Sequence, residues 1–138
     1  MDTKILELET EYMMKVEEYR NKIGSIGSDF FFNEEKEQLI TELCEVKNKY
    51  IADLKLLGIK RGAKVKVDIP PSTEIPVVFH GYIEYIDFTG EYYQDDVRVS
   101  VSIPDQHGKR VTHKYATICT YIKPHWITVN PTDYIFGV

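Results

Sequence analysis

Four histidines and two cysteines are the side chains of this sequence best suited to binding a metal. The histidines are His80, His107, His113 and His125. Imidazole nitrogen is a common zinc ligand, and structural zinc sites usually combine histidine with closely spaced cysteines. The sequence has no CxxC pair, and its two cysteines, Cys44 and Cys119, stand far apart in different halves of the chain. We therefore expect no metal site and no cofactor.

Paired carboxylates and activated nucleophiles are the other candidates for chemistry. Asp87, Asp95 and Asp96 lie close in sequence, as acid–base pairs can, but turns also favour aspartate because its side chain bonds to nearby backbone. No GxSxG, GxxxxGK[ST], GxGxxG or HExxH motif occurs. Cys44 falls on the flank of a predicted helix, which is a poor setting for a reactive thiolate. The sequence therefore predicts a protein that is not an enzyme.

Charge and composition divide the 138-residue chain near Gly58. Residues 1–58 carry 8 basic and 13 acidic side chains, whereas residues 59–138 carry 9 of each, so the net charge of −5 belongs to the first part. All prolines and histidines lie in the second part. We predict an α+β protein with two domains: a helical hairpin over residues 1–58 that acts as an assembly arm, and a small β-barrel over residues 59–138.

Hydropathy and cysteine usage indicate the compartment. No run of about 18 apolar residues occurs, as a membrane span needs, and the first residues are amphipathic and rich in glutamate, unlike a signal peptide. Two distant cysteines are too few for a disulfide framework, which favours a reducing compartment. We expect a cytoplasmic protein that does not bind membranes.

Two apolar stripes predict the helices of an antiparallel hairpin. Their members are Ile5, Leu8, Tyr12, Val16, Tyr19 and Ile23 in the first helix, and Leu39, Leu43, Val46, Tyr50, Leu54 and Leu57 in the second. Each stripe advances at the period of about 3.6 residues that is typical of a straight α-helix. Asn33 suits the N-cap of the second helix, and Gly24 and Gly58 suit the positions just after each helix.

The helices carry more apolar residues than one helix partner needs. Leu6, Met13, Ile40 and Ile51 lie beside the main stripes and widen the apolar faces. Two amphipathic helices can bury such a surplus against a second copy or a larger assembly. We therefore expect a homo-oligomer formed through the helices, or docking on another protein.

Alternating residues and turn signals predict strands after Gly58. They cover Ala63–Ile69, Val77–Phe88, Val97–Ile103, Lys109–Tyr115 and Trp126–Val129, and Ala116–Ile122 fits a strand or a short helical turn. Gly81 interrupts the second run and suggests a bulge or a sharp bend. The rhythm of five short strands over residues 61–130 resembles an SH3-like barrel, and oligonucleotide-binding barrels share it. The resemblance implies a small, mostly antiparallel five-stranded barrel that binds a partner; it does not identify the ligand.

Aromatic residues supply the candidate partner-binding site. Tyr92 and Tyr93 flank a predicted turn, Trp126 opens the last strand, and Phe30 and Phe31 lie in the loop between the helices. Tyrosine and tryptophan are enriched at interfaces because they bury a large area and keep a polar tip. The alternative is that these rings belong to the core.

Basic residues supply a second candidate site. Lys60, Arg61, Lys64 and Lys66 cluster at the start of the predicted barrel, and Lys109 and Arg110 lie at its late turn. With the aromatic residues they could form a platform for single-stranded nucleic acid. An acidic helical pair repels a polyanion unless it points away from this platform.

The predicted function is that of a non-enzymatic interaction or adaptor protein. Its helices mediate self-association or docking, and its barrel loops bind a protein partner. The alternative is a nucleic-acid-binding accessory protein that uses the basic start of the barrel and exposed aromatic residues. The absence of enzyme motifs and targeting signals suits a bacterial or phage accessory protein.

Overall fold

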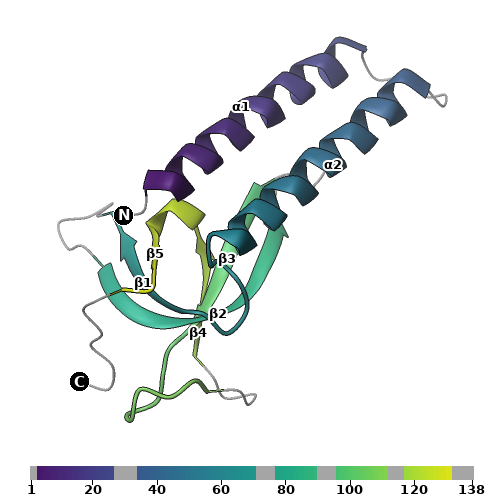
Figure 1. The fold of residues 1–138 in the computed structure, drawn as a ribbon. Coiled ribbons are helices and arrows are strands. Elements are labelled where there is room, and N and C mark those ends of the chain that lie inside the picture. Colours follow the sequence, from purple (N-terminus) through teal and green to yellow (C-terminus); the bar gives the residue numbers. More distant parts are fainter. Residues whose placement is uncertain (1–2, 27–33, 71–76, 90–95, 112–116, 132–138) are drawn as a thin grey trace.

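Two long helices lie side by side over one side of a strongly curved antiparallel sheet (Figure 1). The computed structural model describes residues 3–26, 34–70, 77–89, 96–111 and 117–131. Within these ranges the predicted α+β class is confirmed, because the helices precede five antiparallel strands. The described strands form an open sheet that is not closed into a barrel.

The helices α1 (Thr3–Ile26) and α2 (Glu34–Leu56) follow the predicted stripes. The buried stripe residues are Ile5, Tyr12, Val16, Ile23, Leu43, Tyr50 and Leu54. Gly58 has a φ of +100°, as expected just beyond a helix end. The end predicted at Gly24 is wrong, since α1 continues to Ile26. A glycine within a helix lowers its stability by only about 1 kcal/mol, which the neighbouring turns can offset.

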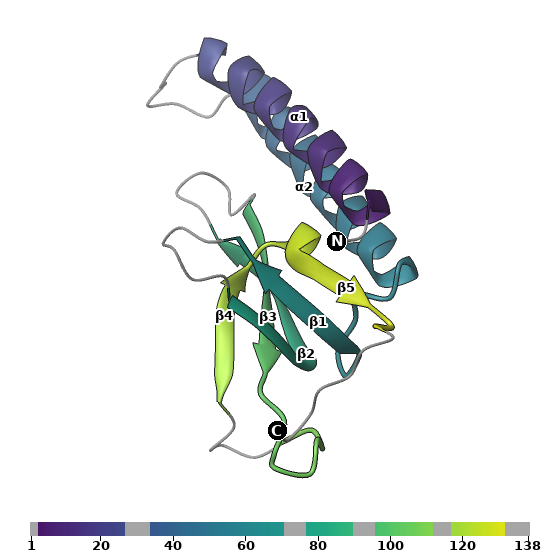
Figure 2. The same ribbon diagram turned by 90° about the vertical axis from the view of Figure 1, so that its left-hand side faces the viewer.

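The sheet has the order β4-β3-β2-β1-β5 (Figure 2). Its strands are β1 (Lys64–Ile69), β2 (Val77–Thr89), β3 (Asp96–Ser102), β4 (Ile118–Ile122) and β5 (Ile127–Val129), with a short 3-10 helix, η1 (Pro124–Trp126), before the last. The run that ends at Ile122, for which the sequence allows a strand or a short helical turn, is therefore a strand from Ile118 onward. Lys109–Val111, which the sequence placed at the start of a strand, are not part of the sheet, and the rest of that prediction lies outside the described residues.

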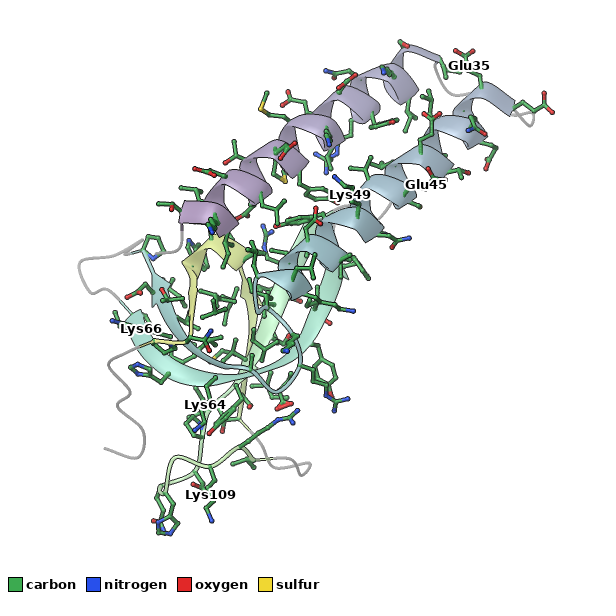
Figure 3. The ribbon with its side chains drawn as sticks, in the orientation of Figure 1. Glu35, Glu45, Lys49, Lys64, Lys66 and Lys109 are labelled. Atoms are coloured by element: carbon green, nitrogen blue, oxygen red, sulfur yellow. The ribbon has the colours of Figure 1, made fainter. Side chains whose placement is uncertain are left out.

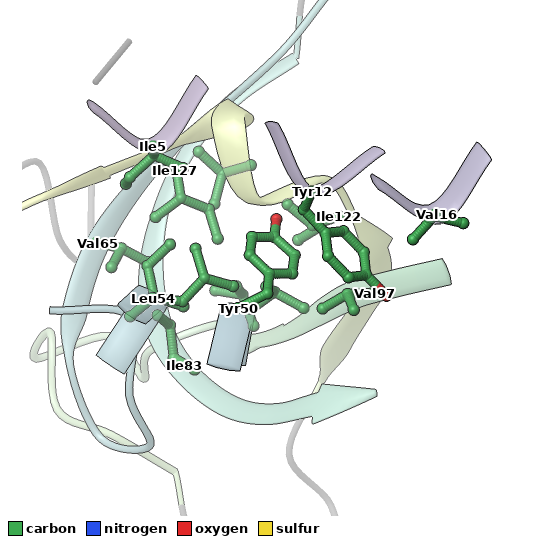
Figure 4. Close-up of a cluster of buried hydrophobic side chains, with 14 of the residues drawn as sticks. Ile5, Tyr12, Val16, Tyr50, Leu54, Val65, Ile83, Val97, Ile122 and Ile127 are labelled. Atoms are coloured by element: carbon green, nitrogen blue, oxygen red, sulfur yellow. The ribbon is translucent and has the colours of Figure 1, made fainter. Parts of the chain in front are cut away.

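Alternation along the strands separates an inner face from an outer face. Val65 and Val67 of β1 and Val97, Val99 and Val101 of β3 are buried toward the helices. Because successive side chains of a strand point to opposite faces, their neighbours lie on the outer face, turned away from the helices. The inner residues join the helix stripes in a single buried cluster (Figure 4).

The centre of this cluster contains two stacked tyrosine rings. The ring centroids of Tyr12 and Tyr50 are 4.1 Å apart, at an interplanar angle of 17°. The hydroxyl of Tyr50 is buried, and none of the described residues gives it a hydrogen bond. Burial raises the pKa of Tyr50, so the group stays neutral.

Tyr50→Phe is expected to raise the free energy of unfolding by about 1 kcal/mol. The change removes a buried hydroxyl without a described partner, whose desolvation is unfavourable, and keeps the stacked ring. Urea denaturation of the two proteins measures the difference. Tyr50→Leu serves as the control, because it also removes the ring and must lower stability. A clear loss of stability in Tyr50→Phe would show that the hydroxyl has a partner in the native protein.

Candidate functional site

The helices carry the acidic excess of the chain, and a group of basic side chains lies on the far side of the sheet (Figure 3). Glu35 and Glu45 project from α2, whereas Lys64, Lys66 and Lys109 lie on the side of the sheet away from the helices. Alternation in β1 explains part of this arrangement, because the valines between the lysines are buried toward the helices. The acidic arm therefore points away from the basic surface.

A β-bulge in β2 places two consecutive side chains, Glu84 and Tyr85, on the outer face. Tyr82 pairs with Ser102 and Ile83 with Val101, but the register then shifts so that Tyr85 opposes Ser100. The extra residue is Glu84, whose side chain is only 7% exposed. Ile83 faces inward, so alternation already turns Glu84 outward, and the extra residue lets Tyr85, opposite Ser100, face outward as well.

Glu84 is held by a network from the segment between β3 and β4. Arg110 Nε donates to Glu84 Oε1 at 2.7 Å, Arg110 Nη2 donates to Oε2 at 2.6 Å, and Ser102 Oγ donates to Oε1 at 3.1 Å. The hydroxyl of Tyr82 donates to the carbonyl of Gly108 at 2.8 Å. The hydrogen bonds from Arg110, partly opposed by burial, lower the pKa of Glu84 from its ordinary value. These bonds fix the segment on the outer face.

Asp105 shapes the turn that presents Lys109. Its Oδ1 accepts hydrogen bonds from the backbone amides of Lys109 at 2.9 Å and His107 at 2.8 Å. These bonds lower the pKa of Asp105, with that of Lys109 as the largest cause. The carboxylate therefore remains ionised and bound to the backbone amides of its own turn.

Cations lie over the tyrosine rings of the outer face. The Arg61 guanidinium carbon is 5.5 Å from the centroid of the Tyr85 ring, and Lys64 Nζ is 5.9 Å from that of Tyr82. Tyr82 is buried, but Tyr85 is 50% exposed. Fixed by the paired strands, these groups form a surface on which a ring and a positive charge are both accessible at Tyr85.

The structure brings together most of the basic residues singled out in the sequence. Arg61, Lys64 and Lys66 lie on or beside β1, and Lys109 and Arg110 reach the same side from the segment after β3. Lys60 is exposed next to Arg61. Arg110 differs from the others, because both of its bonds to Glu84 engage its guanidinium.

A second surface lies along α1. Leu6, Met13 and Met14 are 37%, 41% and 68% exposed, and they line an open groove of about 570 Å³. The polar residues of the groove include Glu9, Glu17, Arg20 and His125. Leu6 and Met13 belong to the apolar surplus recognised in the sequence, whereas Ile40 and Ile51 are half-buried.

The groove borders η1, which packs against α1. Glu9 Oε2 accepts a hydrogen bond from the backbone amide of His125 at 3.1 Å and also contacts His125 Nδ1. Trp126 is half-buried against the core, with Lys123 Nζ 5.5 Å from its ring centroid. The structure thus places Trp126 at the junction of η1 and the core. Tyr92, Tyr93, Phe30 and Phe31 lie outside the described residues.

The described part of the chain lacks both a metal-ligand cluster and a membrane-spanning helix. They contain no group of three or more histidine, cysteine, aspartate or glutamate side chains that could hold a metal ion. None of the helices they form is long and apolar enough to cross a membrane. The sequence matches no protein-family model and no curated protein.

Two polar contacts of these surfaces were not predicted from the sequence. Glu84 and Arg110 are 26 residues apart, and Glu9 and His125 are 116 residues apart. The one signal for the first pair is a glutamate inside an apolar strand run, which requires a buried partner. No local pattern points to the second pair.

Proposed function

We propose that this protein is a non-enzymatic interaction module whose α1 groove binds a basic amphipathic helix of another protein. The exposed apolar patch of Leu6, Met13 and Met14 carries this proposal. Contiguous exposed apolar side chains usually mark interaction sites, and methionine adapts to irregular partners. The groove is parallel to α1, which suits a helix laid along it.

Charge favours a different protein over a second copy as the occupant. Glu9 and Glu17 lie in the groove, and residues 1–58 have a net charge of −5. A second copy would bring two helical pairs of the same net negative charge together, and Glu17 is exposed in the groove. Like charges brought together across an interface disfavour binding, whereas lysines or arginines beside an apolar stripe would complement the groove.

The sheet and the cysteines support further parts of the proposal. The described strands form a meander in which β5 returns beside β1; we propose that it belongs to a small SH3-like barrel. The loops predicted to bind a partner remain candidates for a second contact. Cys44 and Cys119 are free, which agrees with a cytoplasmic location.

Met13→Ser combined with Met14→Ser is expected to weaken binding of a basic amphipathic peptide about tenfold, because it removes apolar contact area at the centre of the groove. The probe is a fluorescent leucine–lysine helical peptide, titrated at physiological salt. Leu56→Ser is the matched control, since Leu56 is 85% exposed on α2 and outside the groove. The affinity of the Leu56→Ser variant for the peptide should equal that of the unmodified protein.

Light scattering on the same samples tests the occupant. The proposal expects a monomer of 16.1 kDa, with or without the substitutions. A dimer that dissociates in the Met13→Ser, Met14→Ser variant would assign the groove to a second copy. Equal peptide affinities in all three proteins would overturn the groove as a binding site.

A further inference from the structure

We propose that the outer face of the sheet binds single-stranded nucleic acid, with Tyr85 as the stacking platform for a base and Arg61 and its neighbouring lysines as the phosphate contacts. This surface is separate from the α1 groove, and the proposal is independent of the one above.

The cations of the outer face form one band. They are Lys64, Lys66 and Lys109, with Arg61 over the ring of Tyr85 and the exposed Lys60 next to Arg61 in sequence. Two nearby carboxylates are already occupied, Glu84 by Arg110 and Asp105 by backbone amides. Two further carboxylates lie on this face: Asp87, two residues from Tyr85, accepts a hydrogen bond from Ser100 at 2.6 Å, and Asp68 lies two residues from Lys66 on β1. These two carboxylates are outnumbered by the cations named above, and the resulting positive balance suits a polyanion.

Tyr85 gives the band the chemistry of a single-strand site. Half of its surface is exposed, and Arg61 lies over its ring. Unpaired bases stack on aromatic rings and on guanidinium planes irrespective of base identity, while lysines and arginines follow the backbone. In a duplex the faces of the bases are covered by their neighbours, so Tyr85 could not stack without opening it.

The acidic helices lie where their negative charge does not oppose the binding of nucleic acid to the outer face. The acidic arm packs on the inner face, and the sheet separates it from the cationic band (Figure 3). The same position excludes duplex reading by a helix in the major groove, because neither helix lies on the basic side. Arg110 has a positioning role, since its bonds to Glu84 hold the segment that presents Lys109.

The test is fluorescence anisotropy with a labelled thymidine oligonucleotide of about 15 nucleotides, compared with a duplex of equal length. The full chain should bind the single strand more tightly. For about four phosphate contacts, log K should fall with log salt concentration at a slope of about −3. Tyr85→Ala should weaken binding about tenfold, whereas Tyr85→Phe, which keeps the ring, should bind like the unmodified protein.

Charge reversal tests the cationic band. Arg61→Glu with Lys64→Glu should weaken binding at least tenfold and flatten the salt dependence, because two phosphate contacts are lost. Lys49→Glu with Lys55→Glu is the matched control: both lysines are exposed on α2, and the net charge changes equally. Thermal unfolding verifies that each variant is folded; if the first is not, the milder Arg61→Gln replaces it.

Three results would overturn the proposal. They are the absence of salt-sensitive binding, a preference for the duplex, and an equal loss of affinity in the two charge-reversal variants. The last would mean that oligonucleotide binding follows net charge alone.

Discussion

Gly81→Ala is expected to lower the free energy of unfolding by about 3 kcal/mol and the melting temperature by about 10 °C. A Cβ atom at this position would lie 2.4 Å from the carbonyl oxygen of Ser102 and 2.6 Å from Cγ1 of Val101. Ser102 is paired with Tyr82, so its carbonyl cannot move without disturbing the β2–β3 ladder. Differential scanning calorimetry measures the loss.

Gly24→Ala is the matched control for this prediction. A Cβ at Gly24 would meet no atom within 4 Å, and the residue lies inside α1. Alanine favours a helix over glycine by up to about 1 kcal/mol, so this variant should be slightly more stable than the unmodified protein. If both alanine variants were stabilised, the close approach of β2 and β3 at Gly81 would be refuted.

The two glycines also show how far local sequence determines the fold. The stripes through Tyr12 and Tyr50 predict both helices, because burial of one face dominates their formation. The sequence alone gives Gly24 and Gly58 the same role, although only Gly58 has the positive φ of a helix end. The difference depends on whether the following residues pack better as a further helical turn, which is a tertiary effect.

The sequence likewise predicts some features of the strands and misses others. Val97, Val99 and Val101 alternate cleanly, and β3 is found where they predict it. Gly81, where the sequence suggests a bulge or a sharp bend, pairs in regular register with Val65, and the register shift lies three residues later, at Glu84. Alternation predicts which face a residue takes only until a bulge, whose place depends on the partner strand.

The candidate surfaces depend on contacts that no sequence window contains. The surplus apolar residues of α1 were visible as a pattern, and Leu6 and Met13 remain partly exposed. The clustering of Arg61 with Tyr85, however, follows from the path of the chain after α2 and from the bulge in β2. Likewise, the basic residues become a separate surface only because the sheet lies between them and the acidic helices.

Glu84→Gln is expected to lower the free energy of unfolding by about 2 to 3 kcal/mol at neutral pH, the second large effect. The change replaces one carboxylate oxygen by an amide that cannot accept from Arg110, and it leaves the half-buried guanidinium without its counter-charge. Removing one partner from a buried, hydrogen-bonded ion pair is much more damaging than its net contribution suggests. Glu45→Gln, at an exposed site on α2, is the control with the same change in charge.

The loss of stability caused by Glu84→Gln should become smaller as pH falls. The native pKa of Glu84 is lowered, so the stability it contributes is fully present above its ordinary pKa of 4.5 and disappears as pH falls through the native value. The stability of Glu84→Gln should therefore fall less steeply in acid than that of the unmodified protein. Some acid dependence should remain, because the pKa of Asp105 is lowered as well.

A double-mutant cycle separates the ion pair from simple loss of packing. Arg110→Met, which keeps much of the side-chain length, should also destabilise the protein, because it leaves the buried carboxylate without its main donor. Combined with Glu84→Gln, it should cost clearly less than the sum of the two single changes, since neither charge is then left unpaired. Strict additivity would mean that the two groups act independently, and it would remove the reason to regard Arg110 as the residue that fixes the β3–β4 segment on the outer face.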